Sequence, residues 1–129
     1  VHLNIANNDL YGPLSDEILD EMSSLNSFIV KDNYFTGRVP SLNISVHGGL
    51  QIFDISANAF SGMIPESIFH LPNLTTLSAS VNCLSTVIPT LICESNISNI
   101  FLSGLHQSEK CATRESILNV NFVTLPDCI

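Results

Sequence analysis

The sequence predicts an α/β solenoid in which copies of one short unit are stacked side by side. Residues 50–65, LQIFDISANAFSGMIP, place apolar side chains at alternating positions and then an Asn, a Gly and a Pro at set spacings. The same pattern fits the chain before and after this stretch. Successive copies of its asparagine are 25, 25 and 24 residues apart, at Asn8, Asn33, Asn58 and Asn82. A period of roughly 20 to 29 residues marks units that bury their apolar face only by stacking on neighbours.

The pattern can be written L-x-x-L-x-L-x-x-N-x-L-x-G-x-I-P, with Phe or Ile accepted at the Leu positions. The first copy is truncated and has Ser15 where the Pro would stand. The fourth copy has Thr86 in place of Gly, and a fifth has Leu105 where the Asn is expected. We therefore predict four repeats over residues 1–92, followed over residues 93–129 by a degenerate fifth repeat and a cysteine-bearing cap.

Each part of the pattern predicts a part of the coil. The alternating L-x-L positions predict a short strand with inward apolar side chains, and strands of successive copies pair in parallel. The asparagine at the next corner can satisfy backbone groups of the turn with its amide, so stacked asparagines form a ladder. Gly permits an unusual backbone conformation after this corner, and Pro fixes the chain as it turns to the outer side.

The outer segments differ from copy to copy. Ser15 is followed by two acids, as at a helix start, and Ile18, Met22 and Leu25 come next at helical spacing. Residues 65–69, PESIF, predict a shorter helical turn with Pro near its first position. The run SLNISVHGG, which ends in two glycines, predicts an irregular loop.

Charge and hydropathy exclude several classes of partner. The chain has a formal net charge of −8, and its 4 basic residues are scattered, at Lys31, Arg38, Lys110 and Arg114. No basic stripe can form, so nucleic acid and anionic membrane surfaces are not expected partners. No apolar run reaches the roughly 18 residues that cross a bilayer, so we expect no membrane insertion within this segment. Because the chain begins inside a repeat, we expect it to be a piece of a longer protein.

The sequence contains no catalytic motif. It has no G-x-S-x-G, no H-E-x-x-H, no phosphate-binding glycine loop and no dinucleotide fingerprint. The four histidines fall in different units, at His2, His47, His70 and His106. Asp54 and Ser56 share a strand with no histidine beside them, which gives a Ser-His-Asp arrangement no support. We therefore expect no enzyme activity, no metal and no cofactor.

Cysteines and glycosylation motifs indicate an oxidising compartment. The four cysteines all lie in the last third of the chain and form no C-x-x-C motif: Cys83, Cys93, Cys111 and Cys128. Three N-x-S/T motifs are present, at Asn43, Asn73 and Asn96. An even, clustered set of cysteines together with three candidate glycosylation sites favours an extracellular or cell-surface location.

The residues between the inward strand positions predict the exposed face of the sheet. This face is mostly small, neutral and lightly polar, with isolated apolar residues at Ile29, Ile52 and Phe101. Exposed apolar residues without a catalytic group favour contact with a protein or peptide, although such residues also simply favour strand formation. We expect a ligand to contact Asn4, Ile29, Lys31, Asp32, Ile52, Asp54, Ser56, Ser78, Ser80 and Phe101.

The stretch SANAFSGMIPESIFHLPNLTTLSAS resembles the plant-type subfamily of leucine-rich repeats, in which L-x-G-x-I-P follows the Asn. The resemblance covers about residues 1–92, with departures at Ser15, Thr86 and Leu105. It implies a right-handed solenoid with a parallel concave sheet, a second short strand near each L-x-G-x-I-P, and short helices, 3-10 turns and loops on the convex side. Known members are mostly extracellular: ectodomains of receptor-like kinases, receptor-like proteins, and secreted inhibitors of cell-wall-degrading enzymes.

The four cysteines are expected to help close the end of the solenoid. They permit three pairings. We favour Cys83 with Cys111 and Cys93 with Cys128, because each pair joins comparable sides of neighbouring coils. Unpaired buried thiols are the alternative.

The sequence thus predicts a non-catalytic extracellular module that binds a protein or peptide on its concave face. We expect it to be part of a cell-surface receptor-like protein, held at the plasma membrane through a segment not present here. A secreted inhibitor of a cell-wall-degrading enzyme and a structural or adhesion solenoid are the alternatives.

Overall fold

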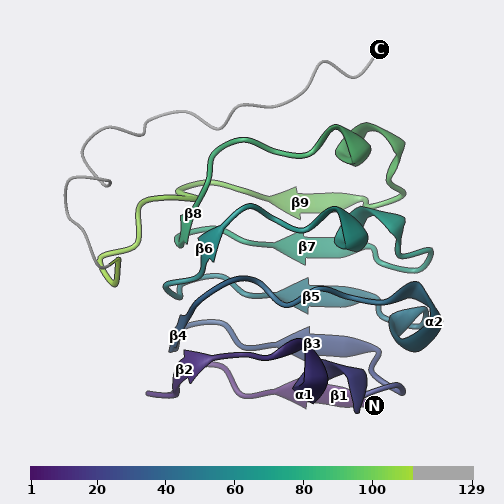
Figure 1. Cartoon of the computed structure of the whole chain (residues 1–129), viewed down its shortest axis with the longest axis horizontal. Helices are drawn as coiled ribbons and strands as arrows, with labels where there is room; N and C mark the ends of the chain where they lie inside the picture. The colour runs from purple at the N-terminus through teal and green to yellow at the C-terminus, as the bar shows by residue number, and fades with distance from the viewer. Residues whose placement is uncertain (112–129) are drawn as a thin grey trace.

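The computed structural model describes residues 1–111, which form a stack of five coils built on one parallel sheet (Figure 1). Each coil adds one strand, so the order of strands in the sheet follows the chain. Neighbouring strands pair in register, with Phe28 beside Phe53 and Phe53 beside Leu77. The predicted solenoid with a parallel sheet is confirmed. Its strands, which number the coils from first to fifth, are β1 (His2–Asn4), β3 (Ser27–Ile29), β5 (Ile52–Asp54), β7 (Thr76–Ser78) and β9 (Asn99–Phe101).

A second set of short strands lies where each coil turns away from the concave sheet, as the resemblance implied. These strands form two parallel pairs, β2 with β4 and β6 with β8. A single bridge between Arg38 and Ser61 connects the two pairs. The strands are β2 (Tyr11–Pro13), β4 (Tyr34–Thr36), β6 (Ser61–Gly62) and β8 (Cys83–Leu84).

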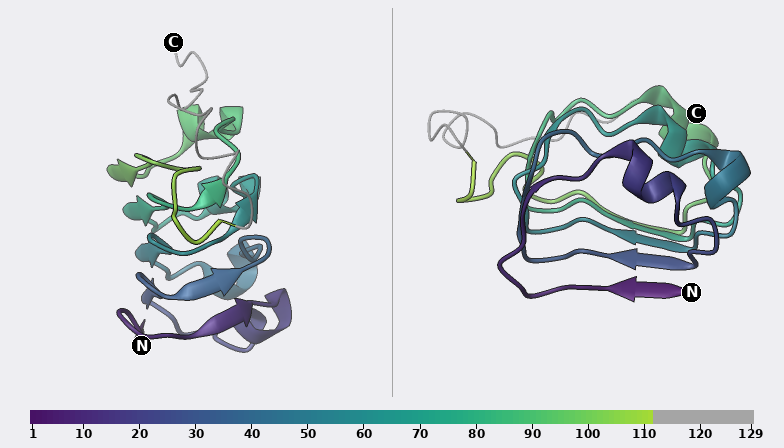
Figure 2. Two further views of the ribbon diagram at one scale, coloured as in Figure 1. Left: turned by 90° about the vertical axis from the view of Figure 1, so that its left-hand side faces the viewer. Right: turned by 60° about the horizontal axis from the view of Figure 1, so that its bottom comes forward.

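Short helical segments lie on the side of the coil opposite the five-stranded sheet (Figure 2). They are α1 (Asp16–Asp20), α2 (Ile44–His47), and the 3-10 turns η1 (Glu66–His70) and η2 (Thr90–Glu94). Ser15 caps α1 as predicted, because its hydroxyl accepts from the Ile18 amide at 3.3 Å. The predicted helical spacing of Ile18, Met22 and Leu25 does not describe the buried side of this helix, because Leu19 is its buried residue and Ile18 is exposed. The helix has only five residues, so the spacing from Ile18 to Leu25 does not continue along one helical face.

The prediction of an irregular loop for SLNISVHGG is also wrong, because this run contains α2. The Asn43 side chain caps the helix by accepting from the Ser45 amide at 3.0 Å. His47 is buried, and one ring nitrogen, Nε2, lies 2.8 Å from the Leu19 carbonyl oxygen. The other, Nδ1, accepts from the Asn43 backbone amide at 3.0 Å. These contacts hold a helical turn that the glycine pair alone did not suggest.

The core consists of columns of apolar side chains that run from coil to coil. Phe28 stacks on Phe53 with ring centres 5.4 Å apart, and Phe35 stacks on Phe60 at 6.2 Å. Burying a side chain of this kind contributes about 1.5–3 kcal/mol. Because each ring needs its neighbour above or below, the apolar core stabilises the stack rather than any single coil.

Buried asparagines join the coils at the corner after each concave strand. The Asn58 side chain is fully buried, and its Nδ2 lies within hydrogen-bond distance of three carbonyl oxygens, those of Val30 at 3.0 Å, Ile55 at 3.2 Å and Ser56 at 3.0 Å. Its Oδ1 accepts from the Phe35 amide of the preceding coil at 3.1 Å. Asn33 and Asn82 make the equivalent contacts.

The first and fifth coils depart from this arrangement. Asn8 is exposed, and its Nδ2 donates only within its own coil, to the Ile5 and Ala6 carbonyls. In the fifth coil Leu105 stands at the ladder position with its side chain buried in the core. The Leu105 backbone carbonyl accepts from the Leu84 amide at 2.8 Å, in the role that an asparagine Oδ1 has in the other coils. The ladder of asparagine side chains therefore ends at Asn82, and in the fifth coil the backbone carbonyl of Leu105 replaces the side-chain acceptor.

The ladder predicts a large difference between two chemically identical substitutions. Asn58→Ala leaves a buried backbone amide and buried carbonyls without partners, so we expect a loss of about 3 kcal/mol in the free energy of unfolding. Asn8→Ala removes two contacts at an exposed corner, and we expect a loss below about 1 kcal/mol. Urea unfolding of both variants measures the difference, and equal losses would contradict the role assigned to the ladder.

Candidate functional site

A shallow hollow of about 450 Å³ lies on the concave face and is lined by residues of the second to fifth coils. Its floor comes from β5 and β7, Phe101 of β9 stands at one side, and the residues of the following corner form the edge. The lining residues combine a carboxylate, hydroxyl groups, one lysine and three apolar side chains: Lys31, Asp54, Ser56, Ala57, Thr76, Ser78, Ser80, Val81 and Phe101.

The acidic group of the hollow is oriented by its own strand. Asp54 Oδ1 accepts from the Ser56 amide at 3.0 Å and from the Ser56 hydroxyl at 2.6 Å. Ser56 is consequently buried, although the sequence predicted an exposed side chain. The second oxygen of Asp54 has no hydrogen-bond partner among residues 1–111. Ser56 therefore positions the carboxylate, and Asp54 offers the free acceptor.

The apolar prominence of the face is Phe101. Its side chain is 54% exposed, whereas Ile29 and Ile52, which the sequence also suggested as exposed, are half-buried. Aromatic side chains that are exposed on a rigid strand provide large contact areas with little loss of conformational entropy. Phe101 is thus the apolar residue of the sheet that is best placed to contact a partner.

The structure brings together six of the ten residues that the sequence singled out: Lys31, Asp54, Ser56, Ser78, Ser80 and Phe101. Asn4, Ile29 and Ile52 lie on the same sheet outside the hollow, and Asp32 turns to the corner, where it pairs with Lys110. Sequence reasoning did not select three other lining residues: Ala57, Thr76 and Val81. They occupy outward columns beside the selected ones, so the repeat register itself was the available signal.

The corner that borders the hollow has an unusual backbone conformation. The residue before each ladder position has a positive φ, between 54° and 66°, at Asn7, Asp32, Ala57, Val81 and Gly104. Glycine adopts this region freely, and Asn and Asp tolerate it, but a β-branched side chain is strained there. Val81, with φ of 57°, therefore holds an exposed apolar side chain at the edge of the hollow at a cost in stability.

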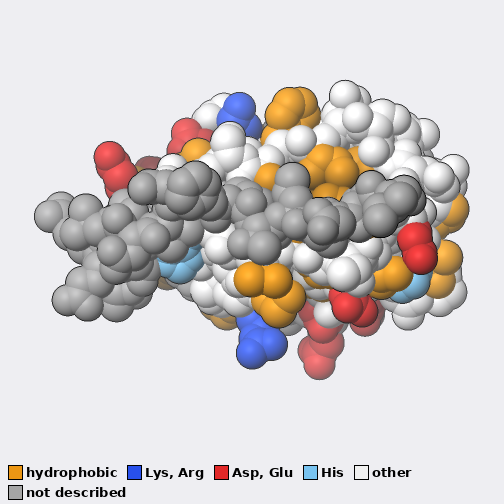
Figure 3. Space-filling view, turned by 90° about the horizontal axis from the view of Figure 1, so that it is seen from above, with side chains coloured by type: hydrophobic (Ala, Val, Ile, Leu, Met, Phe, Trp, Pro, Cys, Tyr) orange, Lys and Arg blue, Asp and Glu red, His pale blue; other side chains and the backbone are white. Residues whose placement is uncertain are grey.

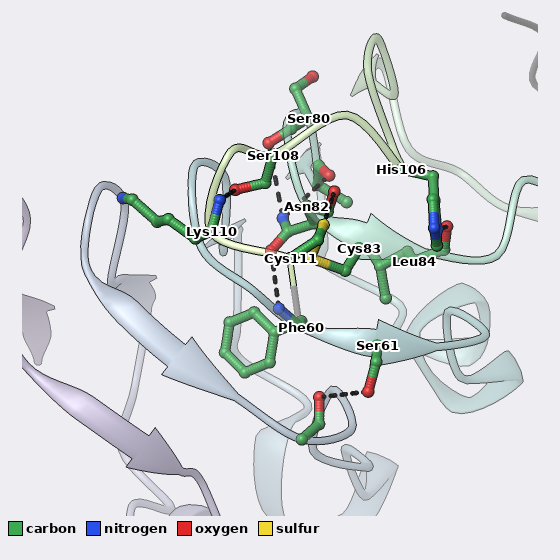
Figure 4. Close-up of a disulfide and its surroundings, with 12 residues drawn as sticks. Phe60, Ser61, Ser80, Asn82, Cys83, Leu84, His106, Ser108, Lys110 and Cys111 are labelled. Atoms are coloured by element: carbon green, nitrogen blue, oxygen red, sulfur yellow. Dashed lines mark hydrogen bonds between the residues drawn. A yellow bond between two sulfur atoms is a disulfide. The ribbon is translucent and has the colours of Figure 1, made fainter. Parts of the chain in front are cut away.

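Residues 104–111 form a strap that runs back from the fifth coil along the ladder corner (Figure 4). A disulfide joins Cys83 to Cys111, with Cα atoms 5.6 Å apart. The Ser108 amide donates to the Asn82 carbonyl at 3.0 Å, which fixes the strap over the last asparagine of the ladder. Cys93 is disulfide-bonded as well. Cys128 lies outside the described residues, so its pairing with Cys93 stays a prediction.

Lys110, which precedes Cys111, is the second anchor of the strap. Its ammonium group has three N–H donors, and three oxygens from the second and third coils surround it: Asp32 Oδ1 at 3.2 Å, the Asn33 carbonyl at 2.8 Å and the Ala57 carbonyl at 3.0 Å. The same nitrogen lies 4.6 Å from the centre of the Tyr34 ring. The strap therefore connects coils that are not neighbours in the stack.

Charge is spread thinly over the surface. Seen from above, acidic side chains lie around the rim and the few Lys and Arg side chains are separate (Figure 3). Within residues 1–111 no three His, Cys, Asp or Glu side chains gather where they would hold a metal ion. Among the helices of the same residues, none has the length and hydropathy needed to span a membrane.

Comparisons with known proteins agree with this architecture. The Leucine Rich Repeat family model matches residues 49–71. Receptor-like protein 9b of Arabidopsis thaliana is 32% identical over 90 residues, or 68% of this chain. Receptor-like protein 14 of the same species is 36% identical over 96 residues, or 73% of this chain. The chain spans 9% of the length of each of these relatives.

Solved structures show the same stack of coils. The ectodomain of the receptor kinase SOBIR1 from Arabidopsis thaliana superposes on 80% of this chain, and on 55% of its own, with a TM-score of 0.69 and 32% identity. PEPR1, solved with AtPEP1, superposes on 79% of this chain and on 14% of its own, with a TM-score of 0.71 and 27% identity. HAESA is an Arabidopsis receptor kinase that was solved with the peptide hormone IDA and the co-receptor SERK1. It superposes on 78% of this chain and on 17% of its own, with a TM-score of 0.68 and 28% identity.

The repeat pattern, the parallel sheet and the family match show that this chain is a leucine-rich-repeat protein. Its relatives are plant receptor-like proteins, and its structural neighbours are ectodomains of plant receptors, so it is a receptor-like leucine-rich-repeat module.

The strained corner predicts a stabilising substitution. Val81→Asn replaces a β-branched residue with one that tolerates the left-handed region, so we expect a gain of about 1 kcal/mol in the free energy of unfolding. Val87→Asn is the control, because Val87 is also an exposed valine but has no positive φ. We expect no gain there. A lower stability for Val81→Asn in urea unfolding would show that its packing outweighs the strain.

The strap predicts coupling between its two anchors. Lys110→Met keeps the apolar stem but removes the three donors, and we expect a loss of about 1 kcal/mol. Replacing Cys83 and Cys111 with Ser opens a loop with a sequence separation of 28, which we expect to destabilise the fold by roughly 3 kcal/mol.

In the background without this disulfide, Lys110→Met should reduce stability by less than half as much, because the strap no longer holds the ammonium in place. Urea unfolding of the four proteins completes the cycle. An equal effect of Lys110→Met in both backgrounds would show that the two anchors are independent.

Proposed function

We propose that this receptor-like module binds a segment of a protein or peptide in the concave hollow. The observation that carries the proposal is that the exposed Phe101 and the oriented carboxylate of Asp54 lie in one column of the sheet, two strands apart, within a hollow of about 450 Å³. Ligand sites commonly measure roughly 300–1,000 Å³ and combine apolar walls with a few placed polar groups. The hollow fits this description.

The lining chemistry suits a peptide segment in an extended conformation. The hydroxyl groups of Thr76, Ser78 and Ser80 can each donate to or accept from backbone amides. The free oxygen of Asp54 accepts from an amide or a cationic group, and Lys31 donates to a carbonyl or carboxylate. Phe101 supplies contact area for an apolar side chain. Peptide recognition needs this combination of backbone pairing and side-chain contact.

The comparisons support the same interpretation. HAESA, whose ectodomain is similar in fold and 28% identical, was solved with a peptide hormone. For this chain we propose a cell-surface or secreted location and a non-catalytic role, with no cofactor. We also propose that residues 93–129 close the stack, with the strap as the described part of that cap. The remaining predicted contacts, Asn4, Ile29, Asp32 and Ile52, would extend the ligand's path beyond the hollow.

A peptide selection tests the proposal. The secreted protein is immobilised, peptides are selected from a random display library, and the dissociation constant of the selected peptide is measured by calorimetry. Phe101→Ala should weaken binding by about 30-fold, as expected for an aromatic hot spot worth roughly 2 kcal/mol. Asp54→Ala should also weaken it, through the loss of the oriented acceptor.

Met63→Ala is the matched control, because Met63 is 52% exposed against 54% for Phe101 but lies outside the concave sheet. We expect its affinity to equal that of the unchanged protein. Peptides that bind Phe101→Ala as tightly as the unchanged protein, or a selection that yields no peptide, would overturn the proposal.

A further inference from the structure

A second groove, of about 530 Å³, lies on the convex side, away from the face to which we assign the ligand. Its walls come from α1, α2, η1 and the residues that precede α2. Its lining includes Asp16, Asp20, Ser41, Asn43 and Ile44. The concave-site proposal uses none of these residues.

Asn43 is the residue of this groove that begins an N-x-S/T motif. It begins the motif Asn43-Ile44-Ser45, and its side chain is exposed. Its Oδ1 accepts from the Ser45 amide at 3.0 Å and from the Ser45 hydroxyl at 2.6 Å. Its Nδ2, the atom to which an N-linked glycan is attached, has no hydrogen-bond partner among residues 1–111. The structure thus uses the oxygen of this amide and leaves the nitrogen available.

The backbone of Asn43 is held firmly beside the groove. Its amide donates to Nδ1 of the buried His47, which fixes the proton of that neutral ring on Nε2. Nε2 in turn donates to the Leu19 carbonyl of α1 at 2.8 Å. Asp16 Oδ1 accepts from the Ser41 amide at 2.9 Å, so the opposite wall is tied to the same segment. These hydrogen bonds tie Asn43 to α1, one wall of the groove.

We propose that Asn43 carries an N-linked glycan and that its first N-acetylglucosamine lies in this groove. In the attachment step Nδ2 bonds to C1 of the sugar and loses one proton. The bond from C1 to the phosphate oxygen of a lipid-pyrophosphate-linked oligosaccharide donor breaks, and the pyrophosphate leaves with the electron pair. The occupant of the groove is thus a neutral, hydroxyl-rich group that is covalently tethered at its edge.

The groove offers partners that match such a sugar. Asp20 and the second oxygen of Asp16 can accept from sugar hydroxyls, and the Ser41 hydroxyl can donate to or accept from the ring substituents. Ile44 is exposed beside Asn43 and presents an apolar surface to the face of the sugar. Two carboxylates in the lining disfavour an anionic occupant. A neutral sugar can bind both the polar groups and the apolar surface of the groove.

The other two motifs provide internal references. Asn96 is exposed, and Asn73 is exposed but its Nδ2 donates to the Gly48 carbonyl at 2.6 Å. Because the inference rests on the proposed extracellular location, occupancy at Asn96 reports whether the chain enters the glycosylating compartment. The state of Asn43 can then be judged separately.

The test begins with the full chain secreted from a host that leaves high-mannose glycans. Mass spectrometry of glycopeptides measures the occupancy of each asparagine, and we expect Asn43 to be occupied. The position of the sugar in the groove is then examined in a protein that carries Asn73→Gln and Asn96→Gln, so that Asn43 is the remaining glycan site. Endoglycosidase H trims this glycan to a single N-acetylglucosamine.

Asn43→Asp in the same background is the matched control, because Asp keeps an acceptor for the Ser45 amide but cannot be glycosylated. Hydrogen exchange of residues 16–20 and 66–70, the walls of the groove, should be slower by about threefold in the protein with one sugar than in the control. Full removal of the glycan by peptide N-glycosidase, which converts Asn43 to Asp, should abolish this protection.

Each other outcome overturns a definite part of the proposal. An occupied Asn43 with unchanged exchange in both walls would show that the sugar extends into solvent. A bare Asn43 beside an occupied Asn96 would exclude the modification while leaving the extracellular location intact. Three bare asparagines would overturn both. Loss of peptide binding at the concave face, with Asn43 occupied and the walls protected, would affect only the proposed function.

Discussion

The structure depends on the asparagine amides buried at the corner after each concave strand. A corner inside a protein leaves backbone donors and acceptors without partners, and burying them unpaired is costly. One amide group supplies both an acceptor and two donors, so Asn58 satisfies groups of its own coil and of the preceding coil at once. This contact sets the register between coils. The concave strands then pair in line, and Asp54, Ser78 and Phe101 of the hollow stand in one column across the sheet.

Much of the fold could be predicted because the repeat is a physical requirement. Each coil needs inward apolar side chains, a corner amide and a turn, and these positions recur every 24 or 25 residues. The columns of the sheet follow from that register, which is why most of the hollow was foreseen. The failures lie where contacts are local and particular to one coil. The helical turn at Asn43 depends on the buried His47 and its two ring contacts, and no repeat pattern contains that information.

The exposed residues of the two faces have different physical origins. On the concave side the repeat determines where side chains point but leaves their identity free, so the combination of Asp54 and Phe101 is particular to this chain. On the convex side the segment that leads back to the sheet differs from coil to coil: it contains an α-helical turn at α1 and α2, and a 3-10 turn at η1 and η2. Unequal return paths create a groove between adjacent turns. The regular concave sheet and the irregular convex side thus give the module two separate surfaces, the concave hollow and the convex groove.

The three oxygens around the Lys110 ammonium have a consequence for cooperativity. In a simple stack each coil contacts only its neighbours, so an end can fray one unit at a time while the rest stays folded. Lys110 follows the fifth coil but binds Asp32 of the second and Ala57 of the third, and the disulfide ties the same strap to the fourth. The end cannot peel away without breaking contacts in the middle. The strap therefore converts a one-dimensional array into a closed unit, in which the coils that form the concave hollow unfold together.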